Sequence, residues 1–159
     1  MLMRRKDVAA IKHILFVCTG NTCRSPLAEA LLRSKATDGV EVKSAGVYAM
    51  PDMPASDGTM DVLKEKGIEL DHKSQPVTKE LVDWADLVLT MTKSHHETTV
   101  QLYPEAADKI FTIKEFAADI TGPEGDITDP IGGSAEMYRK TAEELEPLID
   151  AVLEKIKHV

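Results

Sequence analysis

A thiol and a guanidinium stand six positions apart in the segment CTGNTCRS, at Cys18 and Arg24. A loop of this length can curl so that successive backbone N–H groups converge on one anion, and a helix that starts there adds partial positive charge. Such a field favours the thiolate, so we predict Cys18 as a nucleophile at neutral pH. The planar fork of Arg24 suits two phosphoryl oxygens better than Lys would. The spacing therefore predicts a phosphate site that contains a reactive sulfur.

The other residues of this loop are predicted to shape the anion site and to support the sulfur. Gly20 and Asn21 tolerate left-handed backbone, and the Asn side chain can lock the curl through local hydrogen bonds. Ser25 can donate a hydrogen bond to the sulfur and so stabilise it as a leaving group. The predicted phosphate-binding residues of the loop are Thr19, Gly20, Asn21, Thr22, Cys23 and Ser25.

Cleavage of a phosphate ester or phosphoramidate also requires a proton for the departing group. Asp129 lies in the irregular segment 118–134, directly before Pro130 and close to a Gly pair. The proline restricts the backbone there, while the loop keeps room to approach a substrate. We predict Asp129 as general acid and base, with Asp126 as the competing candidate. A role for both carboxylates as turn caps remains open at this point.

The elements predicted around these residues alternate between strands and helices. Strands are predicted at residues 13–17, 40–45, 86–91 and 109–114, and helices at 26–36, 57–67, 79–84, 94–103 and 134–157. This order predicts an α/β fold with a parallel sheet. Ligands bind beyond the carboxyl ends of the strands in such sheets, which is where the loop after the first strand lies.

The composition limits the possible partners and locations. The 159 residues, 43% of them apolar, fit one domain at residues 13–159, preceded by an N-terminal extension at 1–12. A net charge of -8 gives no basic footprint for nucleic acid. No run of residues reaches the roughly 18 apolar positions of a membrane span, so we expect a cytoplasmic protein without a membrane partner.

Other kinds of site fit these residues less well. A nucleotide-binding P-loop ends in Gly-Lys-Ser/Thr, whereas no Lys occurs between Cys18 and Arg33. His95 and His96 are adjacent and cannot share a helix face, so we predict a solvated pair and no metal site. A module that only binds phosphoproteins would not need the thiol of Cys18.

The sequence resembles the low-molecular-weight protein-tyrosine-phosphatase family in three motifs: CTGNTCRSPLAEA at 18–30, SAG at 44–46 and DP at 129–130. The resemblance begins near residue 13 and continues to the C-terminus. It implies a flavodoxin-like three-layer sandwich with a four-stranded parallel sheet flanked by helices. It also implies hydrolysis of phosphorylated proteins through a phosphocysteine, with inorganic phosphate as product and no metal or organic cofactor. Ser44 and His72 match positions that brace the loop, together with Asn21 and Ser25.

Two positions resemble the bacterial protein-arginine-phosphatase branch. Thr22 stands where tyrosine-specific relatives carry a bulky aliphatic residue, and its small hydroxyl leaves room for a guanidinium and can bond to it. After Asp129 and Pro130, tyrosine-specific members place aromatic rings, whereas this chain has Ile131 and Gly132. The arginine branch usually has Phe in place of Ile131, a predicted substrate contact. We therefore predict phosphoarginine in proteins as the substrate, with phosphotyrosine as the alternative.

The two cysteines bear on two further interpretations. Relatives that reduce arsenate on the same fold relay electrons through additional cysteines, and this chain has none beyond Cys18 and Cys23. Cys23 is close enough in a curled loop to form a reversible disulfide with Cys18, which predicts redox protection or regulation. The alternative for Cys23 is a small buried apolar side chain.

Overall fold

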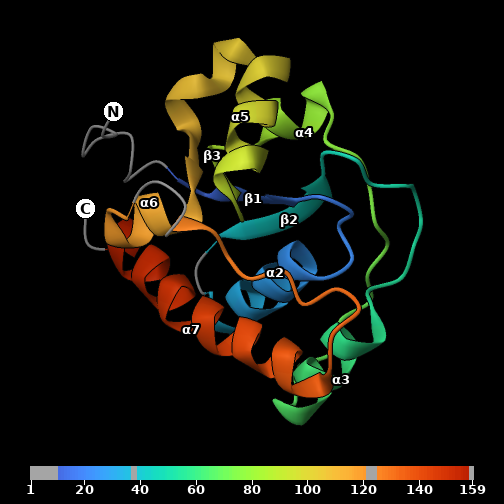
Figure 1. Cartoon of the computed structure of the whole chain (residues 1–159). Helices are drawn as coiled ribbons and strands as arrows, with labels where there is room; N and C mark the ends of the chain where they lie inside the picture. Colours follow the sequence, from blue (N-terminus) through green and yellow to red (C-terminus); the bar gives the residue numbers. More distant parts are fainter. Residues whose placement is uncertain (1–10, 37–38, 121–124, 158–159) are drawn as a thin grey trace.

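A parallel sheet forms the centre of the computed structural model, which describes residues 11–36, 39–120 and 125–157 (Figure 1). Its four strands run in the order β2-β1-β3-β4. They are β1 (His13–Cys18), β2 (Glu41–Gly46), β3 (Leu87–Thr90) and β4 (Ile110–Thr112). All neighbouring pairs are parallel, so the carboxyl ends of the strands meet at one edge of the sheet. Cys18, the last residue of β1, lies at that edge.

Helices cover both faces of the sheet (Figure 1). One face carries α2 (Arg24–Lys35), α3 (Asp57–Glu65) and α7 (Ala135–Lys157), with α6 (Ile113–Ala118) packed beside α7. The other face carries α4 (Lys79–Trp84), α5 (Lys93–Leu102) and the short 3-10 helix η1 (Pro104–Lys109). The three layers confirm the predicted α/β sandwich.

The central strand explains why the sheet must be covered on both sides. Successive side chains of a strand point to opposite faces. In β1, Ile14 and Phe16 join the cluster under α2 and α7, while Leu15 and Val17 join the cluster under α4 and η1. All four are 0% exposed, as expected for a strand buried on both faces, and this burial fixes the position of the loop that follows β1.

The fourth predicted strand is wrong in its second half. The prediction extended it to Lys114, but the structure ends β4 at Thr112 and begins α6 at Ile113. The side chain of Thr112 accepts a hydrogen bond from the backbone N–H of Glu115 at 3.0 Å. This is an N-cap, which starts a helix by satisfying an N–H that has no partner within the helix.

The predicted N-terminal extension lies mostly outside the described residues, since residues 1–10 are not among them. Of its last two residues, Ile11 is buried in the core. The carbonyl of Lys12 accepts the N–H of Glu41 at 2.7 Å and so extends the pairing of β1 with β2. None of the helices in the described part of the chain has the length and apolar character needed to cross a bilayer.

Candidate active site

Asn21 holds the curl of the loop between β1 and α2. Its φ angle of 56° is left-handed, which confirms the prediction for this residue. Gly20, which would also tolerate left-handed backbone, has no positive φ. The side-chain amide of Asn21 donates to Ser25 Oγ at 2.8 Å and to Ser44 Oγ at 2.9 Å. Its Oδ1 accepts the N–H of Gln75 at 3.0 Å, so one side chain ties the loop to two neighbouring segments.

The sulfur of Cys18 lies inside this curl and is in contact with Ser25. Sγ and Ser25 Oγ are 2.8 Å apart, and the residue is 3% exposed. Burial raises the pKa of the Cys18 thiol above its ordinary value, and this effect outweighs the opposing ones. The Ser25 hydroxyl, the backbone N–H groups of Ser25 and Asn21, and the charge of Arg24 all lower that pKa. Burial therefore opposes the dipoles and the charge that favour the thiolate, an effect that the sequence did not reveal, and the acidity of Cys18 stays a prediction.

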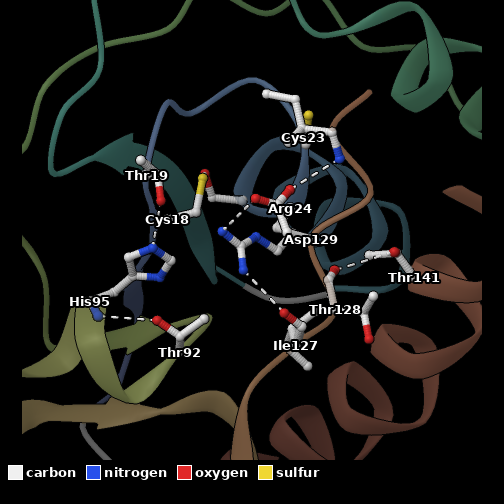
Figure 2. A network of polar contacts seen from close by, with 12 residues as sticks. Cys18, Thr19, Cys23, Arg24, Thr92, His95, Ile127, Thr128, Asp129 and Thr141 are labelled. Carbon is white, nitrogen blue, oxygen red and sulfur yellow. Dashed lines mark hydrogen bonds and ion pairs between the residues drawn. The ribbon is translucent and has the colours of Figure 1, made fainter. Parts of the chain in front are cut away.

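Arg24 connects the loop to a segment about one hundred positions further along the chain (Figure 2). The guanidinium, itself buried, donates to the carbonyl of Ile127 at 3.0 Å and to Asp129 Oδ2 at 3.4 Å. The N–H of Ile131 donates to Asp129 Oδ1 at 3.1 Å, which orients the carboxylate. Asp126 points elsewhere, since its Oδ1 accepts the N–H of Lys93 at 2.8 Å. Asp129 therefore lies at the site, whereas Asp126 binds the backbone at the start of α5.

A second layer of polar side chains braces the loop. His72 was predicted in this role, and its Nε2 lies 2.6 Å from the carbonyl oxygen of Asn21. Ser44 was also predicted, and its hydroxyl donates to Glu29 Oε1 at 2.5 Å. Glu29 was not predicted as part of this layer. Its other oxygen, Oε2, pairs with Arg33 at 2.6 Å. The sequence does mark Glu29, because it is an acidic residue among Leu and Ala in the first turns of a buried helix.

Gly46 was quoted in a motif but given no role, and the structure shows one. It ends β2 beside the loop, and a Cβ at this position would overlap the carbonyl oxygen of Thr19. The same Cβ would lie 2.9 Å from the backbone nitrogen of Asn21. Both neighbours are backbone atoms of the loop, so any side chain here displaces it.

The remaining predicted residues lie around the loop. Thr22 is half-buried, and its carbonyl accepts the N–H of Ser56 at 2.8 Å. Cys23 is buried, with its sulfur 3.4 Å from Ser56 Oγ and 3.6 Å from the hydroxyl of Tyr138. Both cysteines are free thiols, and the reversible disulfide stays a prediction. Ile131 is 67% exposed, as a residue at the mouth of a site would be.

The prediction of a solvated histidine pair is wrong. His95 is 5% exposed, and its Nε2 lies 2.8 Å from Thr19 Oγ1 (Figure 2). His96 is half-buried, with its Nε2 3.1 Å from the carbonyl oxygen of Ile110. Adjacent residues of a helix point about 100° apart, so both can be covered when the helix lies against a sheet. Within the described ranges, no group of three or more His, Cys, Asp or Glu residues is arranged to hold a metal ion.

Comparisons with known proteins give one consistent result. The family described as "Low molecular weight phosphotyrosine protein phosphatase" matches residues 13–159. A protein-arginine-phosphatase of Geobacillus stearothermophilus is 55% identical over 145 residues, which cover 91% of this chain and 96% of that protein. The solved structure of YwlE arginine phosphatase from the same organism has a TM-score of 0.88 and 53% identity, over 92% of this chain and 93% of that chain. A structure of a YwlE mutant with a phosphorylated active site serine has a TM-score of 0.87 and 43% identity, over 92% and 96%.

The contact between Ser25 and the sulfur predicts how the thiol titrates. Because the Ser25 hydroxyl lowers the pKa of Cys18, we expect Ser25→Ala to move it upward. The rate of alkylation by iodoacetamide, followed against pH in a Cys23→Ala background, would then rise at higher pH than in the parent. Ser34→Ala is the control, since Ser34 lies on the same helix and donates to the carbonyl of Leu31. An unchanged alkylation profile in Ser25→Ala would contradict the assignment.

The close approach at Gly46 predicts a loss of anion binding. We expect Gly46→Ala to weaken binding of inorganic phosphate by about 5- to 100-fold, the equivalent of about 1–3 kcal/mol of overpacking. Calorimetric titration measures this effect. Ser34→Ala is the control, because Ser34 lies near the other end of α2 and donates to the carbonyl of Leu31. Equal phosphate affinity in Gly46→Ala and the parent would show that the loop tolerates displacement.

Proposed function

The chain belongs to the low-molecular-weight phosphotyrosine protein phosphatase family, and from this premise we propose that it hydrolyses phosphoarginine in proteins. Residues 13–159 would act as one catalytic domain that needs no cofactor. The observation that carries the proposal is the position of Arg24. Its charge acts on the sulfur of Cys18, and its guanidinium pairs with Asp129 at 3.4 Å. A phosphoryl group bound beside Arg24 would contact the nucleophile Cys18, the guanidinium of Arg24 and the acid Asp129 together.

In the first step, the sulfur of Cys18 attacks phosphorus while the bond from phosphorus to the substrate nitrogen breaks. Asp129 gives a proton to the departing nitrogen, which leaves as an arginine guanidinium. Because burial raises the pKa of the thiol, the proton has to leave Cys18 before the attack. This proton is transferred to the carboxylate of Asp129, which then gives it to the departing nitrogen. Arg24 and the amides of the loop hold the phosphoryl oxygens as charge redistributes.

In the second step, water attacks the phosphocysteine and Asp129 accepts its proton. The bond between phosphorus and sulfur breaks, inorganic phosphate leaves, and the sulfur takes back the electron pair. Ser25 assists this step, because its hydroxyl lies 2.8 Å from Sγ and stabilises the developing thiolate. A mutant of the related YwlE arginine phosphatase carries a phosphorylated active site serine, which supports a covalent intermediate at Cys18.

Specificity for a guanidinium rests on the residues around the anion site. Thr22 is small and carries a hydroxyl that can accept a hydrogen bond from the substrate. The carboxylate of Asp129, when ionised, can pair with the substrate guanidinium, a contact that a phenol cannot make. Ile131 offers no ring on which phosphotyrosine would stack. The protein-arginine-phosphatase of Geobacillus stearothermophilus supports this choice, and the family description supports phosphotyrosine as the alternative.

The proposed partners are phosphorylated proteins in the cytoplasm. A side chain that carries phosphoarginine is long enough to reach a recessed loop while its own protein stays outside. The net charge of -8 favours substrates whose surfaces are neutral or basic near the modified residue.

The assignment of the acid can be tested with two carboxylates of one segment. We expect Asp129→Asn to lower kcat for a phosphoarginine peptide by about 100- to 1,000-fold, since general acid catalysis contributes on that scale. Asp126→Asn is the matched control, because an Asn oxygen can still accept the N–H of Lys93. Steady-state kinetics on both variants measure the difference. A larger loss in Asp126→Asn than in Asp129→Asn would reverse the assignment.

The substrate can be tested on the unmodified protein and at Thr22. We expect the unmodified protein to prefer a phosphoarginine peptide over the matching phosphotyrosine peptide in kcat/KM. Thr22→Ile should lower this ratio by about 10-fold or more, because a bulky side chain replaces a polar contact to the substrate. Thr22→Ser keeps the hydroxyl and serves as control. A preference of the unmodified protein for phosphotyrosine would select the alternative, and a ratio unaffected by Thr22→Ile would remove Thr22 from specificity.

A further inference from the structure

His95 is fixed at the start of α5 and reaches the residue that follows the nucleophile. The side chain of Thr92 caps α5 by accepting the N–H of His95 at 3.1 Å, which holds the backbone of the first turn. The imidazole then extends to Thr19, where Nε2 and Oγ1 are 2.8 Å apart (Figure 2). Thr19 itself is exposed, whereas His95 is buried. The buried histidine therefore holds the loop by a hydrogen bond from inside the protein.

Thr19 is held from both sides of β1, the strand that it follows. On the side of β2, its carbonyl accepts the N–H of Tyr48 at 3.0 Å. On the side of β3, its hydroxyl is bound to His95. The residue before it, Cys18, is the last of β1, and Asn21 with its left-handed backbone follows two positions later. The contact with His95 thus anchors the first peptide of the curl to α5, the helix that follows β3.

The same turn of α5 also holds the segment that carries the acid. The N–H of Lys93 donates to Asp126 Oδ1 at 2.8 Å, and the carbonyl of Met91 accepts the N–H of Ile127 at 2.9 Å. Asp129 follows two residues after Ile127. Residues 91–95 therefore bind both the loop of the nucleophile and the segment of the acid.

The imidazole of His95 is neutral at pH 7. Burial and the charge of Arg24 lower its pKa to about 4, against the opposing charges of Asp126 and Asp129. The second ring nitrogen is Nδ1, which is buried. This Nδ1 has no hydrogen-bond partner among the described residues. The positive charge of Arg24 favours a bare nitrogen in this ring over a protonated one, so we assign the proton to Nε2, which donates to Thr19.

We propose that His95 is a positioning residue, which sets the nucleophile loop and the acid segment at their working separation through its bond to Thr19. This proposal rests on the proposed function, because its test measures the rate of phosphate hydrolysis. It assigns no contact with the substrate to His95. Its consequence is that loss of the bond lowers kcat, because the loop and the acid are no longer held to one common turn.

The test is a double-mutant cycle on the bond between His95 and Thr19. We expect His95→Leu and Thr19→Val each to lower kcat by about 10- to 100-fold with little change in KM, since a misplacement of about 1 Å can cost about 100-fold. The double variant should be no slower than the slower single variant. His95→Gln, whose amide N–H can reach Thr19, should recover at least part of the loss.

Two controls separate positioning from stability and from the proposed function. His96→Gln keeps a donor toward Ile110 on the same turn and should stay within about twofold of the parent, because it leaves the bond between His95 and Thr19 intact. Melting temperatures of all variants report folding. A lower melting temperature with unchanged kcat in His95→Leu, or losses that simply multiply in the double variant, would overturn the proposal.

The cycle is run on a phosphoarginine peptide and on p-nitrophenyl phosphate. Turnover of the aryl phosphate tests the cysteine chemistry alone. If the unmodified protein cleaves the aryl phosphate but not phosphoarginine, the proposed substrate fails while the cycle still decides the role of His95. If both are cleaved and the cycle shows no coupling, His95 is not a positioning residue and the proposed function stands.

Discussion

The site depends on the loop between β1 and α2. This loop turns the chain from a strand into a helix within a few residues, and its backbone amides face inward toward one point. Asn21 makes this possible. It takes the left-handed backbone, and its amide and carbonyl groups bond to Ser25, Ser44, Gln75 and His72. A small loop held only by its own residues would sample many shapes and lose its preference for one anion. Because the partners of Asn21 come from three separate segments, the shape of the curl is tied to the rest of the fold.

The sequence allowed prediction of those parts of the site whose partners lie close along the chain. Cys18 and Ser25 are seven positions apart, so the contact of sulfur and hydroxyl follows from the length of the loop. Asp129 could be chosen because Pro130 marks a restricted turn. The sheet followed from short apolar runs that alternate with helical patterns, and all four strands were found. The strand that ran on into α6 was misjudged because a single capping threonine ended it.

Other parts of the site depend on contacts that no local pattern reveals. Glu29 is 15 positions from Ser44, and His95 is 76 positions from Thr19. Two adjacent histidines do not indicate how a helix is rotated against its sheet, so their burial was missed. The effect of burial on Cys18 was missed for a related reason. The loop suggests which groups stabilise a thiolate, whereas the extent of burial is set by the whole fold.

The separation of Arg24 from Asp129 by 105 positions has a consequence for how the protein is made. During synthesis the N-terminal part emerges first, so the anion cradle is complete in sequence long before the carboxylate that completes it has been added. A chain that ended between the two would also lack α7, whose Leu145 and Ile149 lie in the core on the α2 side of the sheet, so that core would not be buried. Capture of a phosphorylated side chain and its turnover therefore become possible at the same stage of synthesis, once α7 has been made.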